Sequence, residues 1–146
     1  MAKRAAVHVT GLNHLEKGLR TFYPELRVEL KDRFGRIASR IAFIVKGRVP
    51  VGKSKYDRHK GRARASVRWS STAAGARVTE GRKSVPYMRW LDFGGELKPS
   101  GRRHGVRTRE VVRKGRYLYP VVDAHRHEIE RDAERAVSEV MRKAGL

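Results

Sequence analysis

The chain has 146 residues and a formal net charge of +20, from 35 Lys and Arg against 15 Asp and Glu. This length suits a single domain, residues 1–146, with one modest core. The sequence contains no cysteine, which excludes disulfides and thiolate metal sites. Its longest apolar run, residues 41–45, is too short to span a bilayer, so we expect an intracellular protein with no membrane partner.

The positive charge is concentrated in the middle of the chain. Residues 46–116 hold 21 Lys and Arg against 5 Asp and Glu, a net charge of +16. Residues 1–45 contribute +5 and residues 117–146 contribute −1. A block this basic indicates a polyanionic neighbour, either nucleic acid, an acidic protein face or anionic lipid.

The first half of the chain is predicted to be mainly helical. Residues 5–9 are compatible with a short strand, and residues 10–22 with a turn followed by a short helix. From Pro24, apolar residues recur at steps of three and four, which predicts one long amphipathic helix that ends before Pro50. The apolar stripe of this helix consists of Leu26, Leu30, Phe34, Ile37, Ile41 and Ile44.

The middle of the chain changes to the two-residue period of a strand. Ala63, Ala65, Val67 and Trp69 share one face of a predicted strand, and residues 76–81 would complete a hairpin after a turn. A third strand is expected around Leu91 and Phe93, and a fourth within residues 109–114. From Pro120, a second apolar stripe predicts a terminal helix.

The predicted fold class is therefore α+β. A long amphipathic helix and a C-terminal helix would pack on a small antiparallel sheet. Two long basic loops, at about residues 51–62 and 95–110, would extend from this core.

The basic loops supply the candidate binding residues. They are rich in Lys and Arg and nearly free of aliphatic side chains, as expected of loops that contact phosphate groups or dock on acidic partners. The candidates for contact with DNA or with a protein partner are Lys53, Lys55, Arg58, Lys60, Arg62, Arg64, Arg102, Arg103 and Arg107. No helix-turn-helix or RNP-like motif is present, so any contact with nucleic acid should be insensitive to base sequence. Replacing residues 58, 60, 62 and 64 by Ser should leave folding intact.

The sequence contains no pattern that predicts catalysis. Nucleophile, phosphate-loop and metalloprotease motifs are absent, and we expect neither an enzyme nor a cofactor. Asp123, His125, His127 and Glu128 bring titratable groups together. On a helix His125 and His127 point in nearly opposite directions, so we expect a solvated first turn and no metal site.

Residues 85–95 concentrate aromatic side chains in a locally neutral segment. Tyr87, Trp90 and Leu91 have the spacing of one short helical turn that would pack on the long helix, an alternative to the third strand. Gly94 and Gly95 would allow a sharp turn into the second basic loop. Asp92 is a candidate to pair with an Arg or Lys of the same or the next subunit.

Three short segments, taken in order between two helices, carry a family resemblance. These are GRARASV (residues 61–67), YMRWLDFGG (residues 87–95) and RYLYPV (residues 116–121). Their order resembles the head-tail connector and tail-component family of long-tailed bacteriophages, whose members carry TG-x-L-R-x-S-I, Y-A-x-x-V-E-F-G-T and R-P-F-L-x-P-A segments. Identical positions are Gly61, Arg64, Ser66, Tyr87, Phe93, Gly94, Leu118 and Pro120, and Asp92 stands for the glutamate. Arg116, Met88 and Gly95 depart from the pattern, as do two insertions that form the basic loops.

This resemblance implies a structural virion protein with no catalytic residues. It would form a ring, usually sixfold, between the capsid portal and the tail tube, and would be present in the host cytoplasm during assembly. Double-stranded DNA would pass through the ring, and the basic loops would face this channel or neighbouring neck, portal and tail proteins. Candidate packing or subunit contacts are Tyr87, Trp90, Asp92, Phe93, Tyr117 and Leu118.

Two other functions remain open from the sequence. The chain could be a tail terminator protein that caps the tail tube. It could also be a sequence-nonspecific nucleic-acid-binding protein unrelated to phage.

Overall fold

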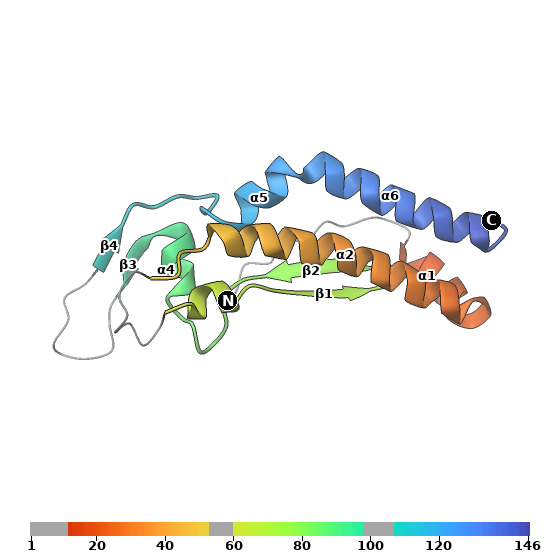
Figure 1. Cartoon of the computed structure of the whole chain (residues 1–146), viewed down its shortest axis with the longest axis horizontal. Helices are drawn as coiled ribbons and strands as arrows, with labels where there is room; N and C mark the ends of the chain where they lie inside the picture. The colour runs from red at the N-terminus through yellow and green to blue at the C-terminus, as the bar shows by residue number, and fades with distance from the viewer. Residues whose placement is uncertain (1–11, 53–59, 98–106) are drawn as a thin grey trace.

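The computed structural model describes residues 12–52, 60–97 and 107–146, in which a long central helix separates a short hairpin from the C-terminal helices (Figure 1). The elements in chain order are α1 (Leu12–Phe22), α2 (Pro24–Arg48), α3 (Arg62–Ala65), β1 (Arg68–Thr72), β2 (Gly75–Thr79), α4 (Met88–Phe93), β3 (Gly95–Leu97), β4 (Arg107–Arg109), α5 (Leu118–Ala124) and α6 (Arg126–Lys143). This mixture of helices and small antiparallel sheets confirms the predicted α+β class. The strand expected at residues 5–9 lies outside the described residues.

Helix α2 is the central element of an elongated molecule (Figure 1). It begins with Pro24 in its first turn and ends with Lys46 and Arg48 in its last, a charge arrangement that suits the helix dipole. The β1–β2 hairpin lies along one side of α2, and α5 and α6 run back along the other (Figure 1). The predicted long helix is thus confirmed almost to its ends.

The predicted strand at residues 63–70 is wrong in its first half, because residues 62–65 form the short helix α3. Gly61 precedes α3 with a φ of 75°, and Ser66 Oγ donates to Ala63 O at 2.6 Å, which closes the turn. Ala63 and Val67 are both buried, but four residues apart they satisfy a helical turn as well as a strand. Strand β1 starts only at Arg68 and pairs with β2, with Trp69 opposite Val78.

The predicted third strand around Leu91 and Phe93 is also wrong, because these residues lie in α4. The short helical turn that the aromatic spacing indicated is the conformation found. The fourth strand is shifted as well: β4 ends at Arg109 and pairs with β3, with Gly95 opposite Arg109. The described strands therefore form two separate two-stranded sheets rather than one sheet.

The predicted terminal helix is divided in two at His125, where α5 ends and α6 begins. His125 has φ −107° and ψ 11°, and its Nδ1 atom lies 2.9 Å from Val121 O. The break turns the chain so that α6 follows α2 over the N-terminal half of that helix (Figure 1).

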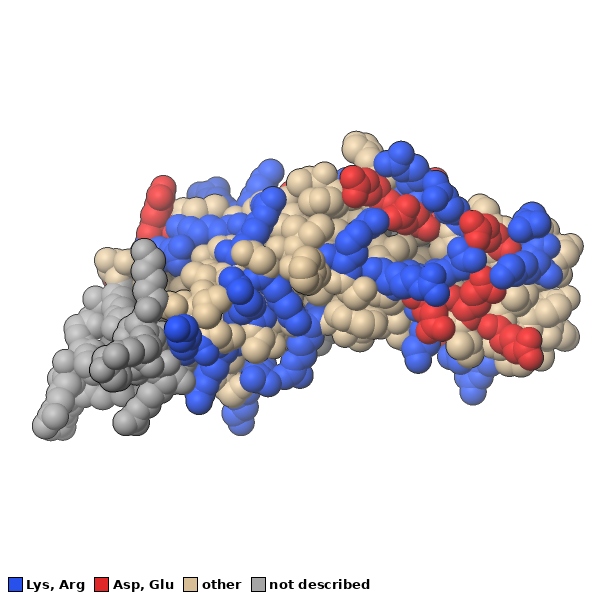
Figure 2. Space-filling model, viewed as in Figure 1, with Lys and Arg blue, Asp and Glu red and all other residues tan. Residues whose placement is uncertain are grey.

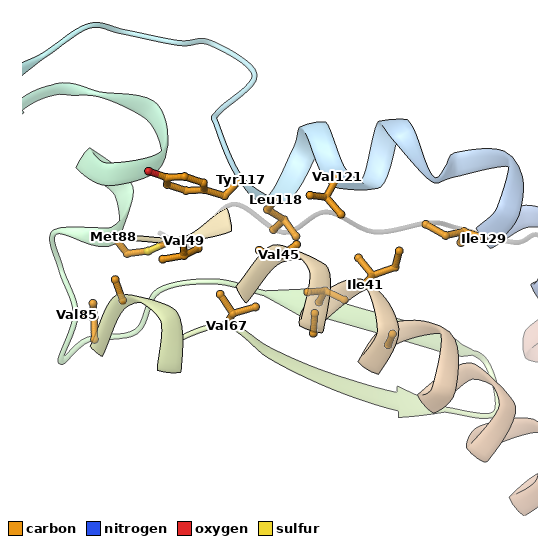
Figure 3. Close-up of a cluster of buried hydrophobic side chains, with 14 residues drawn as sticks. Ile41, Val45, Val49, Val67, Val85, Met88, Tyr117, Leu118, Val121 and Ile129 are labelled. Carbon is orange, nitrogen blue, oxygen red and sulfur yellow. The ribbon is translucent and has the colours of Figure 1, made fainter. Parts of the chain in front are cut away.

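The buried side chains form two clusters along α2. Figure 3 shows the larger one, in which Ile41 and Val45 of α2 and Val49, which follows α2, meet Leu118 and Val121 of α5. The side chains of α3, α4 and the loops around them close this cluster, including Ala63, Val67, Val85 and Met88. The smaller cluster joins α1, α2 and α6 and includes Leu12, Leu19, Leu30, Phe34, Ala133, Ala136 and Val140.

Candidate functional site

Both basic segments begin and end at the same end of the molecule. Residues 53–59 and 98–106 lie outside the described residues, and the structure describes the residues that flank them. Gly61 N donates to Val51 O at 2.9 Å, which ties together the two sides of the first segment. Leu97 pairs with Arg107 across the second. We call this end, formed by α3, α4, β3, β4 and residues 110–116, the basic end (Figure 1).

The candidate basic residues are distributed unevenly over the described chain. Lys53, Lys55, Arg58, Arg102 and Arg103 lie outside the described residues. Lys60 and Arg62 are exposed beside α3, and Arg107 is the first residue of β4.

Arg64 has a structural contact that the sequence did not indicate. Its Nε and Nη2 atoms donate to Val49 O at 3.2 and 3.1 Å, just beyond the C-terminus of α2. The side chain is half-buried and holds α3 against the end of α2. Arg64 therefore stabilises the fold, contrary to the expectation that its replacement leaves folding intact.

On the face shown in Figure 2, Lys and Arg side chains gather toward the basic end, whereas acidic and basic side chains alternate toward the other end. Among described residues, ion pairs connect α2 with α6, as in Arg33–Glu139 at 2.6 Å and Lys143–Glu29 at 2.7 Å. Toward the basic end, several exposed cations form no ion pair with a described residue: Arg68, Arg77, Arg82, Lys83, Arg89, Arg113 and Lys114. Sequence reasoning missed these residues because they are scattered over strands and short connections.

Asp92 joins two of the segments that carry the family resemblance. Its side chain is 0% exposed, and Oδ1 accepts the backbone N–H groups of Arg116 at 2.6 Å and Tyr117 at 2.8 Å. The Arg116 guanidinium donates to two carbonyls, Asp92 O at 3.0 Å and Glu110 O at 2.5 Å. Asp92 thus fixes the chain that leads into α5, and its burial within one chain removes it as a contact to the next subunit.

Two glycines allow the chain to pass close to Asp92. Gly94 has a φ of 80°, and a Cβ atom there would lie 1.9 Å from Glu110 O. Gly115 has a φ of 75°, and a Cβ atom there would lie 2.5 Å from Asp92 Oδ2. Neither position can accept a side chain without moving the backbone or the Asp92 carboxylate.

The aromatic candidates pack around this connection within the single chain. Trp90 Nε1 donates to Gly95 O at 3.0 Å, and the Arg109 guanidinium lies 5.8 Å from the centre of a Trp90 ring. Arg109 also donates to the Tyr117 hydroxyl at 3.3 Å.

The remaining candidates extend the same packing toward the core. Phe93 meets Tyr119 edge to face, with ring centroids 6.2 Å apart. Leu118 is fully buried, and Tyr87 packs partly against the larger cluster. We call the arrangement of residues 80, 92–94 and 115–117 the acid joint.

Glu80 belongs to the acid joint although nothing in the sequence marked it. It follows β2 directly and is 7% exposed. Burial, then a hydrogen bond with the Asp92 side chain and the charge of that group, raise the pKa of Glu80 to about 9. At neutral pH Glu80 is therefore an uncharged acid. In the sequence, Glu80 lies in the segment VTEG (residues 78–81), which has the pattern of an ordinary surface turn.

The structure offers little for metal or ligand chemistry. In the described part of the chain no three His, Asp or Glu residues are placed to share a metal ion. A cavity of about 70 Å³ lies between α2, β2 and α6, and its described lining residues, such as Phe34, Val78 and Ile129, are apolar. Among the described helices, none is both long and apolar enough to cross a bilayer.

Comparisons with protein-family models, with curated proteins and with solved structures give no match to this chain.

Proposed function

We propose that the chain is a structural protein of the neck of a long-tailed bacteriophage, where copies form a ring around the channel that carries double-stranded DNA. The sixfold ring that the resemblance implies is the favoured stoichiometry. The ring would join the capsid portal to the tail, and the protein would bind no cofactor and catalyse no reaction.

The placement at one end of the residues that flank both basic segments carries this proposal. Val51 with Gly61 and Leu97 with Arg107 anchor the two segments at the basic end (Figure 1). A ring with the basic ends directed inward would place cationic loops from every subunit around the channel. Such contacts neutralise phosphates without reading bases, as a passage for DNA of any sequence requires.

The acid joint adds support from the resemblance itself. Two of the segments that carry the resemblance contain Asp92 and Tyr117. These residues are 25 positions apart in the sequence, yet the Asp92 carboxylate accepts the Tyr117 N–H directly. Gly94, one of the identical positions, is required by the close approach of Glu110 O. These two matched segments thus belong to one tertiary unit, which favours a family relationship over a chance match of short segments.

A second candidate function is nucleic-acid binding outside a virion, for which the same basic end would provide the contacts. It differs from the first in assembly, because it needs no ring. A tail terminator protein would also form a ring, and the position of the ring in the virion distinguishes it from a connector.

Light scattering of the purified protein at high salt tests the proposal, since salt removes nucleic acid bound without specificity. The proposal predicts a closed oligomer, either directly or on addition of the portal or tail assembly of the same phage, with ring-shaped particles in electron micrographs. A protein that remains monomeric alone and with both assemblies, while still binding DNA, would favour the second function.

A further inference from the structure

Two carboxyl groups are buried together in the acid joint. Glu80 is 7% exposed and Asp92 is 0% exposed, although they belong to different parts of the chain. Glu80 lies at the end of the hairpin, whereas Asp92 lies in α4. Their side chains are within hydrogen-bond reach of each other. Such a pair of buried carboxyl groups is unusual, because two negative charges repel and lose their hydration.

The Asp92 carboxyl group is held in place by backbone donors, because its Oδ1 atom accepts the N–H groups of Arg116 and Tyr117. The backbone that follows Glu80 is fixed as well, since Gly81 N donates to Ser66 Oγ at 3.0 Å. The Asp92 carboxyl group therefore cannot turn away without breaking these hydrogen bonds.

One oxygen atom of each group remains without a conventional donor. Glu80 Oε2 and Asp92 Oδ2 are buried, and no N–H group or hydroxyl group of the described residues donates to either atom. No cation of the described residues forms an ion pair with either group: the Arg116 guanidinium donates to carbonyl oxygens, and Arg109 donates to the Tyr117 hydroxyl. The charges of both carboxyl groups also act on Tyr119 of α5, a third titratable group.

We propose that Glu80 and Asp92 share a single proton, and that this proton closes a clamp which fastens residues 115–117 and the start of α5 to α4. The pKa of about 9 for Glu80 agrees with this arrangement, because the proton stays bound well above neutral pH. The proposal does not depend on the function of the protein in a phage neck.

Loss of the proton opens the clamp. Two buried carboxylates then repel, and Asp92 can regain hydration only by leaving the N–H groups of Arg116 and Tyr117. Residues 110–117, which connect β4 to α5, lose their attachment to α4. The clamp is thus a pH-sensitive switch that controls how firmly α4 holds the segment that leads into α5.

Tryptophan fluorescence provides a direct test, because the sequence contains only two tryptophans. Trp69 is 47% exposed on β1, whereas Trp90 lies in α4, two residues from Asp92. In a Trp69→Phe background, Trp90 reports on the joint alone. We expect its emission to shift in one transition centred at about pH 9. Glu80→Gln, which keeps a donor but cannot ionise, should abolish that transition.

Tyrosine ionisation is the competing source of a signal at alkaline pH. If the same transition persists in the Trp69→Phe, Glu80→Gln protein, the shift comes from tyrosine and the proposal is wrong. A carbon-13 titration of the Glu80 carboxyl in the unsubstituted protein needs no variant at this position to fold. A midpoint near the ordinary glutamate value, about 4.3, would also overturn the proposal.

Discussion

The Oδ1 atom of Asp92 accepts the backbone N–H of Tyr117 at 2.8 Å, across 25 residues of sequence. This bond fixes the entry to α5, whose first residue, Leu118, is fully buried in the larger core cluster (Figure 3). Asp92 therefore contributes to the stability of the fold, and its substitution should lower the stability of the isolated chain.

Asp92→Ala should destabilise the protein by about 2–4 kcal/mol, because it leaves the N–H groups of Arg116 and Tyr117 without their acceptor. Chemical denaturation of the purified variant measures this loss. Asp32→Ala is the matched control, since Asp32 is exposed on α2 and bonds to no other described residue. Equal stability of the two variants would contradict the role assigned to Asp92.

Gly94→Ala and Gly47→Ala should have opposite effects. Alanine at position 94 meets Glu110 O and a φ of 80°, so we expect a loss of about 3 kcal/mol or more. Gly47 lies in the last turn of α2 with no atom near its virtual Cβ. There, alanine should stabilise by up to about 1 kcal/mol through helix propensity. Thermal melting of the two variants measures both changes in stability. A small loss of stability for Gly94→Ala would contradict the close approach of Glu110 O to residue 94.

Arg64→Ala should cost about 1–3 kcal/mol, the range for hydrogen bonds from a charged donor, because Val49 O loses both its bonds. Arg68→Ala removes the same type of side chain from the exposed surface of β1 and should be nearly neutral. Arg64→Lys should recover only part of the loss, since an ammonium group lacks the guanidinium fork. Urea denaturation curves of the three variants test the order.

Glu80 should make the protein less stable as the pH rises. Its pKa in the folded chain, about 9, lies above the unfolded value, so its contribution is complete below the unfolded pKa and disappears above pH 9. Between these limits the free energy of unfolding should fall by about 1.4 kcal/mol per pH unit relative to Glu80→Gln. Denaturation of both proteins at several pH values measures the difference, and parallel curves would contradict the assignment.

The exposed cations in and beside the basic end should determine the affinity for DNA. Replacing Lys60, Arg82, Lys83 and Arg113 by Gln should lower the slope of log K against log salt by up to about 3–4. The control replaces the same number of exposed cations elsewhere: Arg20, Lys31, Arg131 and Arg135. Fluorescence anisotropy with DNA duplexes of unrelated sequence provides the measurement. Equal loss in both variants would mean that net charge alone governs binding.

The sequence predicted the long elements better than the short ones. Leu30, Phe34 and Ile41 repeat over several turns, and only a helix can bury such a stripe. Ala63 and Val67 fit both periods because they are four residues apart. Only the capping of α3 by Gly61 and Ser66 distinguishes a helix from a strand at this position. Short elements are decided by such local contacts, which composition does not reveal.

The candidate site was predictable only in part. The charge of the middle region follows directly from counting residues, and the aromatic spacing indicated the helical turn at Trp90. The acid joint did not follow, because Glu80, Asp92 and Arg116 meet only in the folded chain. A pKa near 9 depends on burial and on a second carboxyl group, and neither is encoded in the residues adjacent to Glu80.

An electron cryomicroscopy reconstruction of the assembled oligomer tests the central claim most directly. The account predicts a closed ring in which α3, α4 and the β3–β4 pair of every subunit face the central opening, with the ion-paired half of α2 and α6 farther out. A ring whose basic ends point to the outer rim, or an assembly with no central opening, would contradict it.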